Sequence, residues 1–536
     1  MSELEYYPKY VKINKWDLEY AIRKGIGPMT EWVDDKRDGL PYFENYINGS
    51  RYGNHHHFTF SAAHTTGRRL EALTIAEQVT GIKIPEEVYR NLEKWAYRVF
   101  DNPMKMMSNW NIHTFRPEMV CDLHNLREVM YSFIGLLRRN PDDKKARGMV
   151  MHLLEMVDRY TDYEKGIWKE EKFRHDTGGS SMCSVCTQEE GFRFTGSLGR
   201  YIEALMRLCQ EFSVPEALEQ ALRLQETFFR TVLDDTGEFN AHRFCSHIHS
   251  VTAAICGITM LGDYVQDYEI LNRADRFMQK GFYDIAVDMG WSTENDARTD
   301  WVGEVNNSCD LMETCLYLGK NGFPGYYGRA EKMLRSHILP SQLLDVSFLD
   351  DEESGDNSVS QMASRMAGAF GFPCPYGHEE HPGSEISFNW DINAGGVSGL
   401  CQAWRHRVSD NKNFISINLL FNYEDEDIRF FDPYSNHGKA GIFLKQKKTV
   451  RIRLPECSNW QQPDRDKPIS MRKQGEWLYL EELPVGEMIE IPFNLIKLRQ
   501  DITFKGKTLK ALYQGEQLEC ISSQGKRLCY FPEYNG

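Results

Sequence analysis

The chain has 536 residues, of which 41% are hydrophobic and 26% charged, and its formal net charge is −15. This composition is typical of a globular protein with two or three structural units and excludes intrinsic disorder. Acidic and basic residues are mixed along the chain without a Lys/Arg-rich run, so we expect no nucleic acid among its partners.

Targeting and cysteine patterns indicate a cytoplasmic protein. The N-terminal Met1–Tyr7 lacks the basic and apolar regions of a secretory signal. No uninterrupted apolar stretch reaches the ~18 residues of a membrane span, so we expect no membrane partner. The cysteine count of 13 is odd and the cysteines are scattered, which does not fit a disulfide framework. The sequence leaves open whether the protein forms a homo-oligomer.

Helical periodicity dominates up to about residue 408. The apolar positions from Leu126 to Leu137 recur with the spacing of one buried helix face. Pro215 and Glu216 begin another helix, and Ile270 and Phe277 mark a further one. Similar segments are Leu70–Val79, Val88–Val99, Met149–Tyr160, Leu198–Leu208, Val251–Leu261, Leu311–Leu318, Tyr327–Leu334 and Gly395–Arg405.

About a dozen helices joined alternately by short turns and long loops predict paired helices closed into an (α/α)6 toroid. In that arrangement only one layer of long loops faces a substrate. A stacked superhelix is the competing architecture, but the chain has no repeat of fixed period.

After Asn411 the period changes to two. Val450, Ile452 and Leu454 alternate with polar residues, and Trp477–Leu480 and Met488–Ile491 indicate further strands between Gly and Pro turns. Several short strands of this kind predict a C-terminal β-sandwich. We therefore predict a mainly α plus β chain, with a toroid over residues 1–408 and a β-sandwich over residues 409–536.

A loop dense in tryptophans and carboxylates, Gly290–Glu304, is a candidate sugar site. Aromatic rings cover the apolar faces of a sugar, while carboxylates bind hydroxyls or act as acids and bases. An ordinary solvated loop would carry the acids but has no need of the tryptophans. The loop contains Glu294, Asp296, Asp300 and Glu304 beside Trp291 and Trp301.

Three histidines stand at the starts of predicted helices: His64, His124 and His249. A single histidine in such a place is usually a cap or a buried polar group. Because toroid helices that start at one rim point their first turns inward, three equivalent histidines predict convergence on one cavity.

These motifs resemble those of the retaining β-L-arabinofuranosidases of glycoside hydrolase family 127, over most of the chain. The helix-start histidine motifs of that family are similar to His64–Leu70, His124–Glu128 and Ile248–Ser250, and Val450–Pro455 is similar to its strand ending in Leu-Pro. The resemblance implies an (α/α)6 barrel followed by β-sandwich domains, with activity on glycosides.

The resemblance also implies a metal. Asn307–Cys315 is similar to the family segment that ends in Glu-Thr-Cys, whose Glu and Cys bind zinc, so Glu313 and Cys315 become candidate Zn ligands. Their spacing alone favours a capping glutamate and a buried cysteine, because zinc sites usually take three or four ligands. Zn is the only cofactor that the sequence brings into question.

One family feature is missing. The adjacent cysteines of the family, one a zinc ligand and the other the nucleophile, would fall near Trp390–Ala394, where this chain has Asp391. The acid/base glutamate of the family would fall near Ala297, close to Glu294 and Asp296. A carboxylate is ionised at neutral pH and needs no metal to act as nucleophile or base.

We therefore predict a two-carboxylate glycosidase that acts on the terminal sugar of an imported oligosaccharide. Glu294 or Asp296 would protonate the leaving oxygen, and Asp391 would attack the anomeric carbon or activate water. The residues expected to bind the substrate are His64, His124, His249, Trp291, Trp301, Glu304 and Trp390.

Three alternatives remain open at this stage. A metal bound by Glu313, Cys315, Asp391 and a loop histidine would keep the chemistry of the family. Helical toroids also host polysaccharide lyases and sugar isomerases, since fold does not fix chemistry. A catalytically inactive carbohydrate-binding relative would show the same pattern. The sequence names neither the sugar, the linkage nor the anomer.

Overall fold

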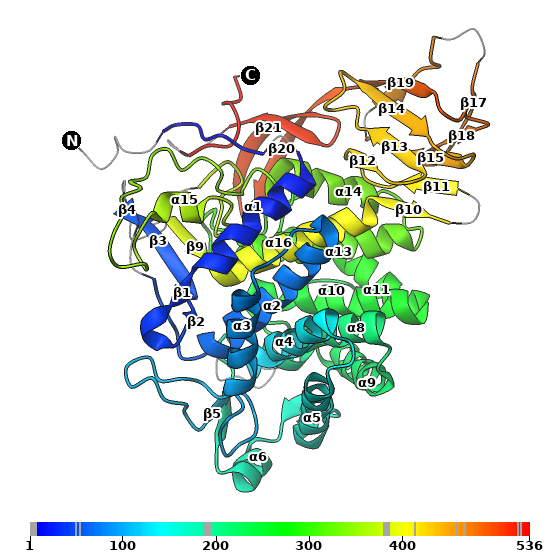
Figure 1. Ribbon diagram of the computed structural model, residues 1–536. Helices are drawn as coiled ribbons and strands as arrows, with labels where there is room; N and C mark the ends of the chain where they lie inside the picture. Colours follow the sequence, from blue (N-terminus) through cyan, green and yellow to red (C-terminus); the bar gives the residue numbers. More distant parts are fainter. Residues whose placement is uncertain are drawn as a thin grey trace.

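The computed structural model describes residues 8–14, 16–48, 51–52, 55–185, 194–378, 386–411, 414–456, 458–464, 468–522, 525 and 528–535. A helical toroid occupies most of the chain, and the β region lies along one side of it (Figure 1). The last toroid helix ends at His406 and the first strand of the β region begins at Val408, where the sequence period changes.

Six helices form a closed inner ring. Each contacts the next in the order α2, α4, α8, α10, α13 and α16, and α16 contacts α2 again. Side chains from their first turns meet, as His64 of α2 does with Asp391 of α16, so the helices start at one rim. Their bounds are α2 (Ser61–Thr80), α4 (Leu126–Arg139), α8 (Arg200–Phe212), α10 (Ile248–Val265), α13 (Val305–Lys320) and α16 (Trp390–His406).

Six outer helices cover the ring, each packed on an inner helix. They are amphipathic, as α11 shows by burying Ile270, Ala274 and Phe277 on one face. The predicted (α/α)6 toroid is therefore confirmed; the sequence did not predict α1, which contains Pro28. The outer helices are α1 (Leu18–Glu31), α3 (Glu86–Arg98), α5 (Lys144–Tyr160), α9 (Pro215–Thr231), α11 (Tyr268–Gln279) and α14 (Tyr326–Met333).

Short elements fill the connecting loops. The helices among them are α6 (Glu170–Thr177), α12 (Phe282–Ile285) and α15 (Met362–Met366), and η4 (Thr195–Gly199) is a π-helical turn leading into α8. The strands are β1 (Val33–Asp34), β2 (Leu40–Pro41), β4 (Arg51–Tyr52), β5 (Val120–Asp122), β6 (Thr161–Asp162), β7 (Ile167–Trp168) and β8 (Ser180–Met182).

One short sheet fixes the start of α16. Strand β9 (Ile386–Asn389) pairs with β3 (Glu44–Asn48) and leads directly into the helix. Asn389 caps α16, since its Oδ1 accepts the Asp391 N–H at 3.0 Å. Asp391 is thereby held in the first turn, where the helix dipole favours a negative charge.

Two five-stranded sheets share one hydrophobic core and form the predicted β-sandwich. Val450 and Ile452 point into this core, as their alternation predicts. One sheet has the order β10 (Val408–Asp410), β11 (Phe414–Ile417), β15 (Thr449–Arg453), β18 (Trp477–Glu481), β17 (Ser470–Gln474). The other has the order β12 (Tyr423–Glu424), β13 (Ile428–Phe431), β14 (Lys439–Leu444), β19 (Met488–Leu495), β16 (Ser458–Trp460).

A third, separate sheet follows the sandwich. The alternation of apolar and polar residues in the sequence does not distinguish its strands from those of the sandwich. The sheet is antiparallel and consists of β20 (Lys497–Phe504), β21 (Lys507–Gln514) and β22 (Gln517–Ile521). Phe504 and Tyr513 of this sheet share a hydrophobic core with Trp291 and Trp301 of the toroid loop. The sheet therefore packs on the toroid.

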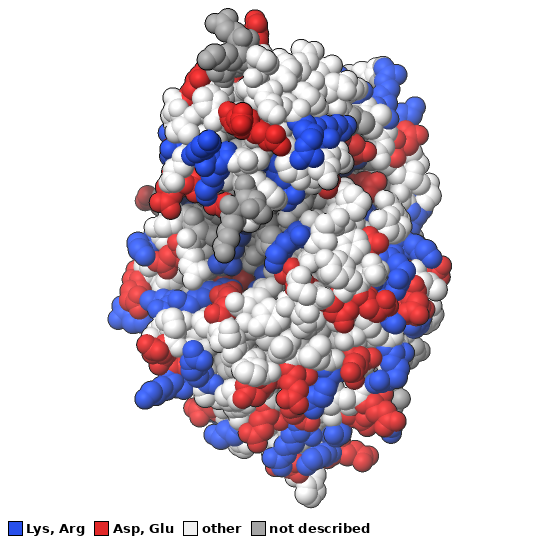
Figure 2. Space-filling model, turned by 90° about the vertical axis from the view of Figure 1, so that its right-hand side faces the viewer, with Lys and Arg blue, Asp and Glu red and all other residues white. Residues whose placement is uncertain are grey.

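The distribution of surface charge and the burial of the most apolar helix are both typical of a globular protein. Lys/Arg and Asp/Glu side chains are interspersed on the face shown in Figure 2, without a large area of one sign. Helix α10 is long and apolar enough to cross a membrane, but 89% of its apolar window is buried inside the protein. It is a core helix of the toroid.

Gly67 sets the distance between the first two inner helices. A Cβ on Gly67 would lie 1.7 Å from the Glu128 carbonyl oxygen of α4. We expect Gly67→Ala to push α2 and α4 apart and to lower the free energy of unfolding by about 1–3 kcal/mol. Urea denaturation followed by circular dichroism measures this.

Gly148→Ala in α5 is the matched control, because no atom lies within 4 Å of a Cβ there. Alanine in this exposed helical position stabilises the protein by up to about 1 kcal/mol. Equal unfolding free energies for the two variants would contradict the tight contact between α2 and α4.

Candidate active site

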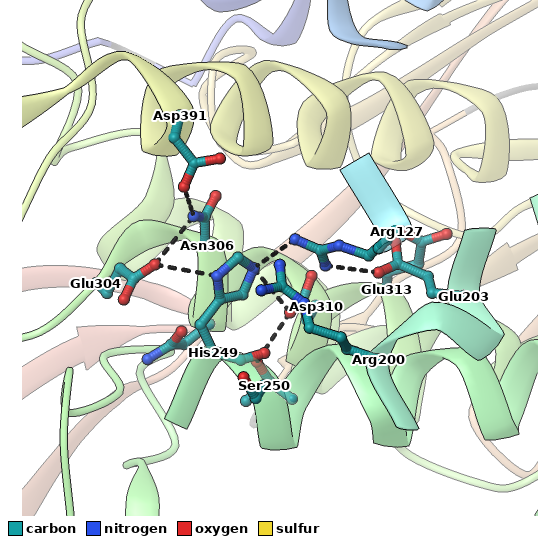
Figure 3. A network of polar contacts seen from close by, with 12 residues as sticks. Arg127, Arg200, Glu203, His249, Ser250, Glu304, Asn306, Asp310, Glu313 and Asp391 are labelled. Atoms are coloured by element: carbon teal, nitrogen blue, oxygen red, sulfur yellow. Dashed lines mark hydrogen bonds and ion pairs between the residues drawn. The ribbon is translucent and has the colours of Figure 1, made fainter. Parts of the chain in front are cut away.

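Asp391 lies at the rim of the inner ring and is held by three donors. Its Oδ1 lies 3.0 Å from His64 Nε2 and 3.0 Å from Arg68 Nε. Its Oδ2 accepts a hydrogen bond from Asn306 Nδ2 at 3.2 Å (Figure 3). Burial acts to raise the pKa of Asp391, but the charges of His64 and Arg68 outweigh it and hold that pKa well below its ordinary value. Asp391 is therefore an anion.

His64 brings a positive charge to this contact. Its Nδ1 lies 2.8 Å from Asn125 Oδ1, while Asn125 Nδ2 donates to the Phe60 carbonyl at 3.1 Å. The imidazole thus faces an acceptor from each nitrogen, and it can donate to both only as the imidazolium. The ring links Asn125 of the α4 entrance to Asp391 of α16.

Glu304 shares the Asn306 amide with Asp391. Asn306 Nδ2 also donates to Glu304 Oε1 at 2.9 Å, and Asn306 Oδ1 accepts from Arg68 Nη2 at 2.8 Å. Because one nitrogen contacts both, Glu304 Oε1 and Asp391 Oδ2 are no more than about 6 Å apart.

The protonation of Glu304 is opposite to that of Asp391. Its side chain is 6% exposed, and no arginine or lysine in the described part of the chain forms an ion pair with it. Burial, followed by the negative charges of Asp391 and Glu294, raises the pKa of Glu304 to about 8. Glu304 is therefore mostly neutral at pH 7, while its neighbour is charged.

His249 lies between Glu304 and a second buried acid. Its Nδ1 is 3.4 Å from Glu304 Oε1, and its Nε2 is 3.2 Å from Arg127 Nη2 and 3.7 Å from Asp310 Oδ2 (Figure 3). Burial and the charge of Arg127 hold the pKa of His249 well below its ordinary value. Burial and Glu203 raise the pKa of Asp310 to about 8.

Four imidazoles follow one another along the rim. Ring centroids are separated by 5.5 Å from His64 to His124, 5.4 Å from His124 to His247 and 6.0 Å from His247 to His249. The structure thus brings together the three histidines that the sequence singled out. His124 also contacts Arg200, and its Nδ1 lies 2.8 Å from the Gly196 carbonyl oxygen.

Glu294 and Asp296, the two acids expected to protonate the leaving group, lie closer to the protein surface than Glu304 does. Glu294 forms an ion pair with Arg298 at 3.1 Å and is 28% exposed, although its charge still reaches Glu304. Asp296 binds Lys505 of the β20–β21 turn at 3.2 Å. The structure therefore sets Glu304, and not Asp296, beside Asp391.

The three tryptophans expected to line the sugar site are core residues. Trp291 and Trp301 pack edge to face with centroids 5.0 Å apart, against Phe504 of β20, and Trp291 Nε1 donates to the Pro373 carbonyl at 3.0 Å. Trp390 is fully buried and stacks on Trp32 at 5.8 Å. Their rings stabilise the loop that ends at Glu304 and the start of α16 that carries Asp391, and they offer no face to a sugar.

The residues that the family resemblance assigns to zinc do not fit a shared ion. Glu313 and Cys315 are two positions apart on α13, so their side chains point to nearly opposite sides of the helix. Glu313 binds Arg207 at 2.6 Å, whereas Cys315 lies near Arg329 and Asp288.

Two other groups of described side chains have a spacing that suits a metal. The first group is His247, His249 and Glu304, and the second is Glu203, Cys256 and Glu313. In the first, Arg127 donates to His249 Nε2, which leaves the proton of the neutral ring on Nδ1, the atom that faces Glu304. In the second, Arg207 and Arg127 already bind the carboxylates. Each set thus contains a member, His249 or Glu203, whose ligand atoms already face protein groups, and we derive no step through a metal.

Several residues of the site were not assigned from sequence. They are Arg68, Arg127, His247, Asn306 and Asp310. Helical spacing would have revealed one of them, because Arg68 follows His64 by four positions, which places both on one face of the helix. The others depend on contacts between helices distant in sequence.

The sequence matches no known family model and no curated protein. Solved structures share its fold, however. A β-arabinofuranosidase of glycoside hydrolase family 127 superposes with a TM-score of 0.60 and 11% identity, over 97% of this chain and 86% of its own. A family 127 β-L-arabinofuranosidase from Geobacillus stearothermophilus T6 gives 0.54 and 9%, over 93% and 80%. A further glycoside hydrolase gives 0.53 and 11%, over 91% and 84%. The fold implied by the sequence resemblance is therefore confirmed.

Proposed function

We propose that this protein is a retaining, exo-acting glycoside hydrolase in which Glu304 is the acid/base and Asp391 the nucleophile. The observation that carries the proposal is a pair of buried carboxyl groups, joined by one amide nitrogen, whose pKa values are pushed in opposite directions. Such a pair supplies a proton donor and an anion at the same pH, as glycoside cleavage requires.

Glu304 suits the role of the acid because its free oxygen can reach a ligand. Oε1 is bound by Asn306 and faces His249, whereas Oε2 has no hydrogen-bond partner among the described residues. Oε2 is also not sealed from solvent, in contrast to the unpartnered Oγ of nearby Ser308. A proton on Oε2 is therefore available to the glycosidic oxygen of a bound substrate.

Asp391 suits the role of nucleophile better than that of base. Its strongly lowered pKa makes it a weak base, but it stays anionic and leaves readily as a carboxylate. The limit of about 6 Å between Glu304 Oε1 and Asp391 Oδ2 is compatible with the ~5–5.5 Å carboxyl separation of retaining enzymes, which supports the retaining outcome.

The reaction follows in two steps. Asp391 Oδ2 attacks the anomeric carbon while Glu304 Oε2 gives its proton to the leaving oxygen, so the glycosidic bond breaks and a glycosyl ester forms. Water then attacks the same carbon, Glu304 takes a proton from it, and Asp391 is released as the carboxylate. Arg68 and His64 stabilise the Asp391 anion at both ends of the cycle.

Burial supports action on a chain end. Both carboxylate side chains are 6% exposed, and such a closed site admits a terminal sugar more readily than the middle of a polymer. Cys256 of α10 and Cys309 of α13 are free thiols, which fits a reducing compartment. We therefore propose a cytoplasmic enzyme that cleaves imported oligosaccharides.

The names of the structural neighbours supply a first substrate class. Two of them are β-arabinofuranosidases, which makes β-L-arabinofuranosides and related aryl glycosides the first compounds to screen. Release of a reducing sugar supports hydrolysis, whereas conversion of a free sugar without bond cleavage would point to an isomerase.

Glu304→Gln tests the acid. We expect kcat/KM of the wild type to fall as pH rises through about 8, because the acid must be protonated and burial raises the pKa of Glu304 to that value. The variant should lose this alkaline limb and about 10²–10⁴-fold in turnover, more for a sugar leaving group than for nitrophenol. Steady-state kinetics between pH 5 and about 9.5 measure both effects.

Glu294→Gln is the matched control, because Glu294 is one of the two acids expected from sequence to protonate the leaving oxygen. It should retain the alkaline limb, since Glu294 is partly exposed and paired with Arg298. If Glu294→Gln loses the limb and Glu304→Gln retains it, the roles assigned here are reversed.

Asp391→Asn tests the nucleophile. We expect turnover to fall by several orders of magnitude with the fold intact, because the amide carries no negative charge. Nuclear magnetic resonance of the product of the wild type should show that the first sugar released has the same anomeric configuration as the substrate. An inverted first product, or near-normal turnover of Asp391→Asn, would contradict the assignment.

A further inference from the structure

We propose that His249 is a positioning residue that keeps the transferable proton of Glu304 on Oε2. The inference rests on the proposed function and gives His249 a role different from the sugar binding expected from sequence. Both of its ring nitrogens face protein groups, so neither is free for a hydroxyl of the substrate.

Arg127 fixes the tautomer of His249. A guanidinium has donors and no acceptor, so the contact of 3.2 Å requires a lone pair on His249 Nε2. A neutral imidazole then carries its single proton on Nδ1. Burial and the charge of Arg127 both favour the neutral ring, because they lower the pKa of His249.

Arg127 itself cannot turn away. Its side chain is fully buried and forms ion pairs with Glu128 at 2.8 Å and with Glu203 at 2.9 Å. Leaving these two carboxylates would strand buried charges, which costs several kcal/mol. The donor that faces His249 is therefore held from α4 and α8 together.

The fixed tautomer selects between the two oxygens of Glu304. His249 Nδ1–H faces Oε1 at 3.4 Å, and Asn306 Nδ2 donates to the same oxygen at 2.9 Å. In a neutral carboxyl the carbonyl oxygen is the stronger acceptor, so the hydrogen bond from Asn306 and the Nδ1–H that faces Oε1 favour Oε1 as the carbonyl. The proton then resides on Oε2, the oxygen without a partner among the described residues.

The ionisable groups around His249 come from the inner helices α2, α4, α8 and α13 and from the N-cap positions of α10 and α13. Asp310 Oδ2 lies 3.7 Å from Nε2 and accepts a hydrogen bond from Thr252 Oγ1 at 2.8 Å. Ionised Asp310 would further raise the pKa of Glu304. The groups that act on His249 are Arg68, Arg127, Arg200, His247, Glu304 and Asp310.

Two substitutions of His249 separate its nitrogens. Asparagine places an amide nitrogen near the position of Nδ1, whereas glutamine extends toward the position of Nε2. We expect His249→Gln to lower kcat by about tenfold or more at nearly constant KM and to move the alkaline limb to higher pH, because Oε1 loses the polar N–H that faces it. His249→Asn should retain about tenfold more kcat than His249→Gln, with the alkaline limb of the wild type.

Equal losses in both variants, with the alkaline limb unmoved, would overturn the proposal and leave a structural role. Nuclear magnetic resonance of protein with 15N-labelled histidine gives a second readout that needs neither substrate nor His249→Gln. The signal missing from His249→Asn identifies His249, and we expect it to report the Nδ1–H tautomer. An Nε2–H tautomer would overturn the inference, whereas failure of the proposed hydrolysis would show separately in Glu304→Gln.

Discussion

The buried contact of Asp391 with His64 and Arg68 is the interaction on which the whole site depends. Two carboxyl groups within about 6 Å of each other, both almost shielded from water, cannot both be ionised unless cations compensate each of them. Both cations come from α2 and both contact Asp391. The charge therefore stays on Asp391, and Glu304 keeps its proton. If Glu304 also had a cation beside it, both carboxyl groups would be ionised and neither could donate a proton.

The toroid produces this asymmetry through its geometry. Six inner helices start at one rim, so α2, α13 and α16 deliver His64, Glu304 and Asp391 to one place although they are far apart in sequence. Close helix contact is needed, and Gly395 of α16 permits it. A Cβ there would lie 1.7 Å from Asn306 Oδ1 and 2.1 Å from Arg68 Nη2. The amide that joins the two carboxyls thus depends on a residue without a side chain.

The fold could be predicted from sequence because helical and strand periods report which face of an element is buried. Period does not report which element covers that face, so β20–β22 could not be separated from the sandwich. Its place at a helix start directed attention to His64, and the place of the missing family cysteines directed attention to Asp391; the structure sets these two side chains 3.0 Å apart. The composition of the Gly290–Glu304 loop led to a wrong prediction for its tryptophans. Trp291 and Trp301 suit a sugar site and a hydrophobic core equally well, and the structure places them in the core beneath β20. The protonation of Glu304 depends on its distance from Asp391, which no local pattern encodes.

Infrared difference spectroscopy of the resting protein tests the central claim most directly, because it detects the state of the Glu304 carboxyl without a substrate. In the wild type minus Glu304→Gln difference at pH 7, we expect the C=O stretching band of a protonated carboxylic acid. This band should disappear as pH rises through about 8. A difference spectrum at pH 7 with carboxylate bands alone would show that both acids are ionised, and the division of roles between Glu304 and Asp391 would be wrong.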